Sequence, residues 1–399
     1  MRHVIRSGAA RVAMCLLAIV FASQLTACAP DEPATQGCLQ GTSLGLVVPV
    51  HQNAQAPAVP STWDCVLDEA VRAGVPISVV TAEGRPQVLV TSYVARLDAA
   101  NSRALEDQVA AAKSSLVAAV AAAAAKSDGN DLLAAIGLVA DLAPGGDIRV
   151  LDNGATDTGA VRTVDPGMST IVDAADVVQH VAEAGACPSV AGSVVTFYGL
   201  GYQVAPAEQL SQRQRDRLGE IWTAVLVSCD ARVSVTPLPR LGDGPAHQFS
   251  AAAIVPEEIG SMTVAPAVAD DERCEAVVPE GRIGFVRDVA TFLDDGAARE
   301  VVRDVAQRLS GCEGNVEVVG TTSSAGDEAG RARVSTARAT AVRDLLAHEL
   351  GLPAAQIEAS GLGFDTSARG RCVEDRVDGV LDPVLAATNR KVIIRVAAR

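Results

Sequence analysis

Short apolar runs alternate with helix-like segments between residues 38 and 239, and this alternation restricts the folds open to the chain. Strands separated by helices indicate a mostly parallel sheet that is covered on both faces. We predict strands at Thr42–Val50, Pro76–Thr81, Gln87–Val94, Asp147–Leu151, Ser193–Tyr198 and Arg232–Val235, and helices at Trp63–Ala73, Asn101–Lys126, Asp131–Leu142, Ser169–Ala184 and Pro206–Val227. The predicted fold class is therefore α/β, with a doubly wound sheet.

The second and third predicted strands are joined by a short turn, Glu83-Gly84-Arg85-Pro86, so they form a hairpin with one antiparallel edge strand. This layout of residues 38–239 resembles a von Willebrand A-like domain. That family binds a metal through an Asp-x-Ser-x-Ser loop after its first strand. Here the corresponding residues, 51–55, are His-Gln-Asn-Ala-Gln and contain no carboxylate. The resemblance therefore implies the layout, and we predict no metal site.

A polar loop at residues 152–159, Asp-Asn-Gly-Ala-Thr-Asp-Thr-Gly, follows a predicted strand. Ligands of doubly wound sheets bind outside the carboxyl ends of the strands, so the loop could hold a cation or another ligand. Asx-rich turns are also common without any ligand, because their side chains bond to nearby backbone groups. Both interpretations stay open at this point.

The first 28 residues resemble a bacterial lipoprotein signal. Arginines in the first eleven residues precede an apolar segment, residues 12–21, of signal-peptide length. Leu25-Thr26-Ala27-Cys28 then resembles a lipobox, in which cleavage leaves Cys28 as the new N-terminus with fatty-acyl chains such as palmitate. An uncleaved anchor and an ordinary secretory signal are the alternatives. We predict a signal peptide at 1–27, an anchor and tether at 28–37, and a location on the extracytoplasmic face of a bacterial membrane.

Export would place the cysteines in an oxidising compartment, where disulfides are the default. Of nine cysteines, Cys15 is removed and Cys28 is lipidated, which leaves seven. Cys187 and Cys229 each precede a predicted strand and are the first candidate pair. Because seven is odd, one thiol should stay free or pair elsewhere. No pair has the CxxC spacing of a metal site, and the five histidines are scattered, so we predict neither a metal nor a cofactor.

The net charge of −15 argues against a nucleic-acid partner, because phosphate binding needs a basic surface. The chain has no G-x-S-x-G elbow, no P-loop and no paired His and Cys with catalytic spacing, so we predict that it is not an enzyme. The isolated histidines are interpreted as surface or structural residues.

Residues 240–279 contain Gly242-Asp243-Gly244-Pro245 and further prolines, and we predict a linker there. A second α/β unit follows at 280–399. Its predicted strands are Ile283–Arg287, Asn315–Val319, Ile357–Ser360 and Lys391–Val396, and its predicted helices are Ala297–Leu309 and Ala329–Leu350.

In this unit a Gly/Ser/Thr turn separates a strand from a helix that carries Arg331 and Arg338 two turns apart on one face. Free N–H groups and the helix dipole favour an anion at such a helix start, and Arg338 could form a bidentate pair with a carboxylate. An ordinary solvated helix is the alternative.

The segment Gly320-Thr321-Thr322, the loop and Val334-Ser335-x-x-Arg338-Ala339-x-x-Val342-x-x-x-Leu346 resemble the C-terminal domain of the OmpA family, which binds peptidoglycan. Asn389-Arg390-Lys391-Val392 and Gly361-Leu362-Gly363 are similar to two further motifs of that family. The resemblance covers residues 280–399.

In that family a loop aspartate pairs with the amine of diaminopimelate, and the helix arginine takes the carboxylate. This chain has Arg338 but carries Ser323 at the aspartate position, so the amine loses a charged partner, and Asp327 or Glu328 could compensate. The resemblance implies a peptidoglycan site made of Thr322, Ser323, Asp327, Arg331, Arg338, Asn389 and Arg390.

These features together predict a lipid-anchored cell-envelope protein that binds peptidoglycan non-covalently, while residues 38–239 bind an unknown protein partner. The alternative is an interaction or assembly module whose OmpA-like part has lost peptidoglycan binding, and Ser323 favours it. A hydrolase or ligand sensor built on residues 38–239 is a third, weaker hypothesis, because a catalytic constellation is missing.

The lipobox gives the first testable prediction. Cys28→Ser should abolish labelling by a fatty-acid probe and either release the protein from membranes or leave an unprocessed precursor, because the acylated thiol is gone. An unchanged mass and membrane partition after the substitution would exclude the lipoprotein interpretation.

Overall fold

The computed structural model describes residues 37–238, 249–256, 263–265 and 273–397. The lipobox with Cys28 lies outside these residues. We refer to the described part of 38–256 as the first module and to that of 263–397 as the second module.

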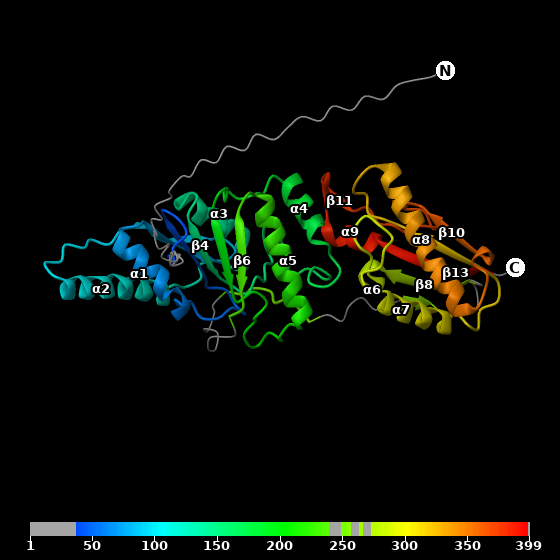
Figure 1. Cartoon of the computed structure of the whole chain (residues 1–399), viewed down its shortest axis with the longest axis horizontal. Helices are drawn as coiled ribbons and strands as arrows, with labels where there is room; N and C mark the ends of the chain where they lie inside the picture. The colour runs from blue at the N-terminus through cyan, green and yellow to red at the C-terminus, as the bar shows by residue number, and fades with distance from the viewer. Residues whose placement is uncertain (1–36, 239–248, 257–262, 266–272, 398–399) are drawn as a thin grey trace, which may run out of the picture. The chain divides into compact units, whose positions relative to one another are not determined.

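The first module is built on a six-stranded sheet (Figure 1). Every neighbouring pair is parallel except the hairpin of the two strands at one edge. In spatial order the strands are β3 (Gln87–Tyr93), β2 (Ile77–Ala82), β1 (Leu44–Pro49), β4 (Asp147–Leu151), β5 (Val194–Tyr198) and β6 (Arg232–Thr236). This order reverses between β1 and β4, as in a doubly wound fold, which confirms the predicted α/β class and the antiparallel edge.

Helices cover both faces of this sheet because successive strand residues point to opposite sides. Leu46 packs in one hydrophobic cluster and its neighbour Val47 in the other. The first cluster includes α1 (Asp64–Ala73), preceded by a 3₁₀ turn at Ser61–Trp63, and α2 (Ser102–Ala121); the second includes α3 (Leu132–Leu142), α4 (Ala174–Glu183) and α5 (Gln212–Ser228).

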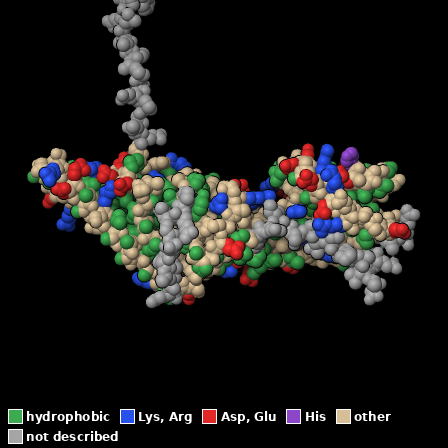
Figure 2. Space-filling view, turned by 90° about the horizontal axis from the view of Figure 1, so that it is seen from below, with side chains coloured by type: hydrophobic (Ala, Val, Ile, Leu, Met, Phe, Trp, Pro, Cys, Tyr) green, Lys and Arg blue, Asp and Glu red, His purple; other side chains and the backbone are tan. Residues whose placement is uncertain are grey.

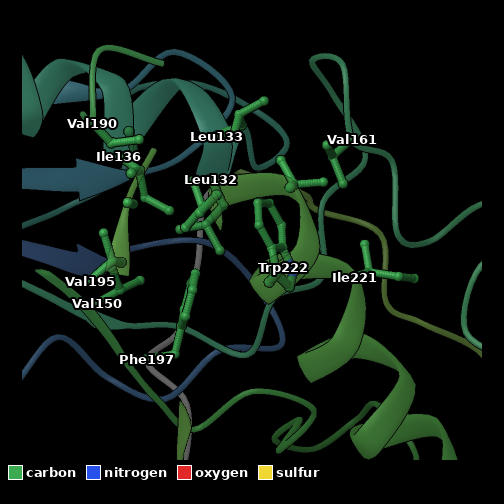
Figure 3. Close-up of a cluster of buried hydrophobic side chains, with 14 of the residues drawn as sticks. Leu132, Leu133, Ile136, Val150, Val161, Val190, Val195, Phe197, Ile221 and Trp222 are labelled. Atoms are coloured by element: carbon green, nitrogen blue, oxygen red, sulfur yellow. The ribbon is translucent and has the colours of Figure 1, made fainter. Parts of the chain in front are cut away.

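Trp222 of α5 is fully buried in the second cluster, with its ring beside that of Phe197 (Figure 3). Helices α4 and α5 begin five or six residues later than predicted, because Asp173 and Ser211 cap their first turns.

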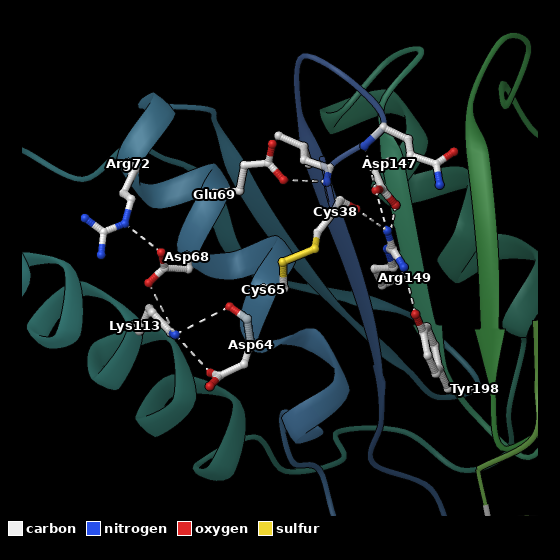
Figure 4. The surroundings of a disulfide bond; sticks show 12 residues. Cys38, Asp64, Cys65, Asp68, Glu69, Arg72, Lys113, Asp147, Arg149 and Tyr198 are labelled. Atoms are coloured by element: carbon white, nitrogen blue, oxygen red, sulfur yellow. Dashed lines mark hydrogen bonds and ion pairs between the residues drawn. A yellow bond between two sulfur atoms is a disulfide. The ribbon is translucent and has the colours of Figure 1, made fainter. Parts of the chain in front are cut away.

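Among the residues that the structure describes, three disulfides reinforce the modules: Cys38–Cys65, Cys187–Cys229 and Cys274–Cys312. The second is the pair predicted from the sequence, and Cys372 is the one cysteine of the described residues that stays free; it is buried. Figure 4 shows how Cys38–Cys65 ties the start of the first module to α1. Beside it, Arg149 donates to the Cys38 carbonyl (2.9 Å) and to Asp147 (2.7 Å).

The second module contains a five-stranded sheet with helices on one face. In spatial order its strands are β10 (Ile357–Gly361), β9 (Asn315–Gly320), β13 (Lys391–Ala397), β8 (Arg273–Pro279) and β7 (Thr263–Ala265). Its helices are α6 (Glu280–Ile283), α7 (Asp295–Arg308), α8 (Glu328–Leu350) and α9 (Pro383–Asn389), and it also has a 3₁₀ turn at Ala354–Gln356 and a ribbon of β11 (Arg376–Val377) and β12 (Val380–Leu381).

Two predictions for this region are wrong. The predicted linker, 240–279, contains β7 and β8, and β8 pairs along all of β13 with Ala276 and Val278 buried. The prolines and glycines around this strand favoured a linker in the sequence. The predicted strand Ile283–Arg287 is instead the end of α6 followed by a turn at Gly284, whose φ of 70° is readily adopted by glycine.

Acidic and basic side chains lie interspersed on the face shown in Figure 2. Within the described residues, no helix is long and apolar enough to cross a membrane.

The cysteine pairing gives the second prediction. Alkylation of the denatured but unreduced protein should modify one of the seven cysteines at positions 38–372, namely Cys372, because the other six are paired. Peptide mass spectrometry would identify the labelled residue. Labelling at Cys187 or Cys229 would contradict the pairing, and reduction before alkylation is the control that should label all seven.

Candidate ligand site

The OmpA-like loop is placed by an unusually close approach of α8 to the ends of two strands. A Cβ on Gly361 would lie 2.1 Å from the backbone nitrogen of Thr336, and one on Gly320 would lie 2.3 Å from the Ser335 carbonyl oxygen. Only glycine fits at these positions. The two glycine motifs therefore let α8 lie against β9 and β10, so that the loop 321–327 sits at the end of the sheet.

The loop is held by its own polar groups. Asp327 caps α8 by accepting the N–H of Gly330 (2.6 Å). Arg331 donates to the carbonyls of Ser324 (3.0 Å) and Gly326 (2.6 Å), so this guanidinium supports the loop. Thr322 is buried and its hydroxyl has no hydrogen-bond partner within the described part of the chain. A buried hydroxyl without a partner costs free energy.

Arg338 faces a carboxylate that belongs to the chain itself. Its Nη2 lies 2.6 Å from Glu280, its Nε donates to the Val289 carbonyl (3.2 Å), and its guanidinium stacks 4.9 Å from the centre of the Phe285 ring. Burial lowers the pKa of this guanidinium, and Glu280 opposes the change. Its Nη1 makes no hydrogen bond to the described residues, so two donors are left for a ligand.

Arg390 joins the loop to the first module. It bonds to Asp176 of α4 and to Glu280 (2.7 Å), and its Nη1 lies 3.5 Å from the Ser323 hydroxyl. Burial raises the pKa of the Asp176 carboxyl, while Arg390 pulls it down. Arg390 therefore bonds to an acid of α4 and also lies beside Ser323, which stands at the position of the family aspartate.

These residues surround one cavity of about 450 Å³, a size typical of small-molecule sites. Helix α4 contributes Asp173, Asp176 and Gln179 to its lining. Six of the residues predicted from the sequence line it as well: Thr322, Ser323, Asp327, Arg331, Arg338 and Arg390.

Asn389 is the predicted site residue that does not line the cavity. Its amide donates to the Val373 carbonyl (2.8 Å) and to Asp375 (3.0 Å), and its oxygen accepts the Val373 N–H (2.8 Å). Its role is to fix the segment that supports the loop, because Asp375 in turn accepts the N–H of Ser324 (2.9 Å).

The sequence did not identify Glu280, Asp173 or Asp176 as site residues. Asp173 was recognisable only as a helix cap, since its carboxylate accepts the N–H of Ala175 (2.9 Å). Nothing near Asp173 and Asp176 in the sequence indicates that they meet a loop more than a hundred positions away.

A second contact joins the modules beside the cavity. Glu183 of α4 lies 3.1 Å from Arg376 and accepts the N–H of Leu381 (2.8 Å), and His180 bonds to the Leu381 carbonyl (2.7 Å). Ala387 of α9 packs in a hydrophobic cluster of the first module. Residues 38–399 accordingly form one compact unit.

The polar loop 152–159 of the first module bonds mainly to its own surroundings. Asp152 pairs with His51 (2.9 Å) and accepts the N–H of Gly154 (2.7 Å), while Asp157 accepts that of Asn130 (2.7 Å). These bonds account for its conformation without a ligand. Among the residues that the structure describes, no three His, Cys, Asp or Glu side chains are grouped to hold a metal ion.

Residues 285–372 match the OmpA family. This part of the chain is an OmpA family domain. It comprises the loop, α8 and Arg338, whereas Glu280 and Arg390 flank it in the sequence. No curated protein matches the chain.

Several solved structures are similar to part of this chain. The cell wall anchor of the T6SS from Pseudomonas aeruginosa is 25% identical, with 35% of this chain and 88% of that chain covered and a TM-score of 0.27. The OmpA-like domain of FopA1 from Francisella tularensis is 18% identical, with 34% and 80% covered and a TM-score of 0.25. A periplasmic domain of Helicobacter pylori MotB is 16% identical, with 35% and 88% covered and a TM-score of 0.25.

The contact at Glu183 gives the third prediction. Desolvation opposes its ionisation, but bonds from Gln179 and Leu381 and the charge of Arg376 lower the pKa of Glu183 to about 2 from its ordinary 4.5. A depressed carboxyl pKa stabilises the folded state above pH 4.5, and this stabilisation is lost as the pH falls toward 2.

Glu183→Gln should therefore lower the free energy of unfolding at pH 6 by about 1 kcal/mol, a modest value because the pair is partly exposed. The difference from the wild type should vanish near pH 2. Urea titrations at several pH values would measure it, and a difference that is independent of pH would refute the assignment.

Proposed function

We propose that the protein is a lipid-anchored component of a bacterial cell envelope that binds peptidoglycan non-covalently through its OmpA family domain. The observation that carries the proposal is the cavity, because six residues chosen from family motifs line one space of suitable size. The proposed anchor is Cys28, and a protein partner of the first module is part of the proposal.

Each lining residue has a chemical role in this proposal. Arg338 takes a carboxylate of the wall peptide through its free Nη1, and the unpaired Thr322 hydroxyl orients that carboxylate. Arg331 and Asp327 hold the loop and the first turn of α8. Ser323 is a weak acceptor for the peptide's ammonium group, because a neutral hydroxyl lacks the charge of the family aspartate.

A second candidate function has its own support. Arg338 and Arg390 both already pair with carboxylates of the chain, so neither is a bare cation awaiting an anion. An OmpA-like domain used only to dock on α4, or on another protein, would show this arrangement. In that case the chain is an interaction or assembly module without wall binding.

Peptidoglycan retention separates the two functions and is the fourth prediction. The wild type should sediment weakly with purified diaminopimelate-type peptidoglycan. Arg338→Ala should abolish retention, because the wall carboxylate loses its main charge partner. Arg343→Ala is the matched control on α8, since Arg343 bonds to Asp344 and does not line the cavity.

Ser323→Asp should strengthen binding by about tenfold, which is the lower end of the range for a charge-assisted hydrogen bond. The gain stays small because Arg390 lies 3.5 Å from the Ser323 hydroxyl and would share the new negative charge. Absence of the wild type and of both variants from the pellet would reject peptidoglycan binding in favour of the interaction module.

A further inference from the structure

We infer that the first module forms part of the ligand site: Asp173 of α4 binds the ammonium group of a zwitterionic ligand whose carboxylate lies against the arginines of α8. This inference rests on the proposed function and deepens it. The ligand class is an amino-acid end that carries both charges, as at the tip of a diaminopimelate side chain.

The charges that line the cavity favour such a ligand. Five carboxylates and five guanidinium groups of the described residues line it. Two of the carboxylates, Asp173 and Asp176, come from α4, so the second module alone would present an excess of positive charge. With α4 in place the cavity is balanced but polar, which suits a ligand with separated charges better than a simple anion.

Positive groups without a carboxylate partner lie on the α8 side. Arg331 bonds to carbonyls alone, and Arg333 makes no ion pair with the described residues. Thr322, whose hydroxyl is buried and unpaired within the described part of the chain, lines the same cavity. These donors match a carboxylate, whereas Asp173 and Asp176 line the cavity from the first module.

Asp173 is the accessible acid on that side. Its side chain is 37% exposed, against 2% for Asp176, which is committed to Arg390. Asp173 accepts one N–H from Ala175 and lies 3.0 Å from Arg287, so lone pairs remain for an ammonium group. Although desolvation opposes its ionisation, the Ala175 N–H and Arg287 lower the pKa of Asp173, and it is charged at neutral pH.

The position of α4 also bears on Ser323. Arg390 contacts Asp176 on one side and lies 3.5 Å from the Ser323 hydroxyl on the other. Asp176 therefore stands one guanidinium away from the loop position where the family has its aspartate. A carboxylate from the neighbouring module compensates for the one that the loop lacks.

The opposite role for these acids is that they block the arginines and keep ligands out. The remaining cavity of about 450 Å³, with α4 in place, favours an open site. The two roles predict changes of opposite sign when the charge of Asp173 is removed.

The test uses the full chain and two probes, a peptidoglycan tripeptide that ends in diaminopimelate and the same peptide with its side-chain amine acetylated. Asp173→Asn removes the charge but keeps a good helix cap. Asp131→Asn is the matched control, because Asp131 caps α3 in the same way (3.0 Å to the Ala134 nitrogen) and does not line the cavity. Calorimetry or fluorescence titration gives the affinities.

We expect Asp173→Asn to weaken binding of the free-amine peptide by about three- to tenfold, because the substitution removes a charge-assisted hydrogen bond that solvent partly screens. Binding of the acetylated peptide should not change. Asp131→Asn should change neither. An equal loss of affinity for both peptides, or no loss, would overturn the inference about Asp173. The proposed function would still stand in that case, provided that the wild type binds the peptide. Tighter binding by Asp173→Asn would assign the blocking role instead. A wild type that binds neither the peptide nor intact peptidoglycan would overturn both.

Discussion

The buried guanidinium of Arg390 determines how the acids and helices around it are arranged. An unpaired buried charge is very costly, and removing one partner from a buried pair typically costs about 3–5 kcal/mol. Arg390 is 12% exposed and meets this requirement with Asp176 and Glu280, while Glu280 also serves Arg338. Two arginines and two acids thus form a neutral cluster. Its members come from α4, the start of α6, α8 and the residue before β13, so four elements converge on it.

This cluster also explains why the two sheets do not behave as independent units. Helix α4 contributes to the core of the first module through Val177 and Val181, and to the second module through Asp176 and Glu183. Because apolar packing fixes α4 to the first module and ion pairs fix it to the second, a displacement of one module is coupled to the other through this helix. The cavity at this end of the OmpA family domain is therefore lined by residues of both modules.

Much of the fold was predictable because its signals are local. The strands of the first sheet, the hairpin at residues 83–86 and the helix after the Gly320 loop each have their own pattern of apolar and turn residues. Strand β8 was missed because a short alternation is hard to detect between prolines and glycines. The site was predictable only where family motifs mark it. Asp173 and Asp176 reach it through tertiary contacts, for which nothing in the neighbouring sequence is a signal.

The shared carboxylate of Glu280 has a thermodynamic consequence. One of its oxygens lies 2.6 Å from Arg338 and the other 2.7 Å from Arg390, so one acid divides its charge between two arginines that line the cavity, and Arg390 also bonds to α4. Any molecule that draws Arg338 away from Glu280 frees that charge for Arg390. Occupancy of the cavity and attachment of the first module are then linked equilibria, and each must change the other by the same factor. For a molecule that binds in the cavity, pulling the modules apart and releasing that molecule would then report the same coupling free energy.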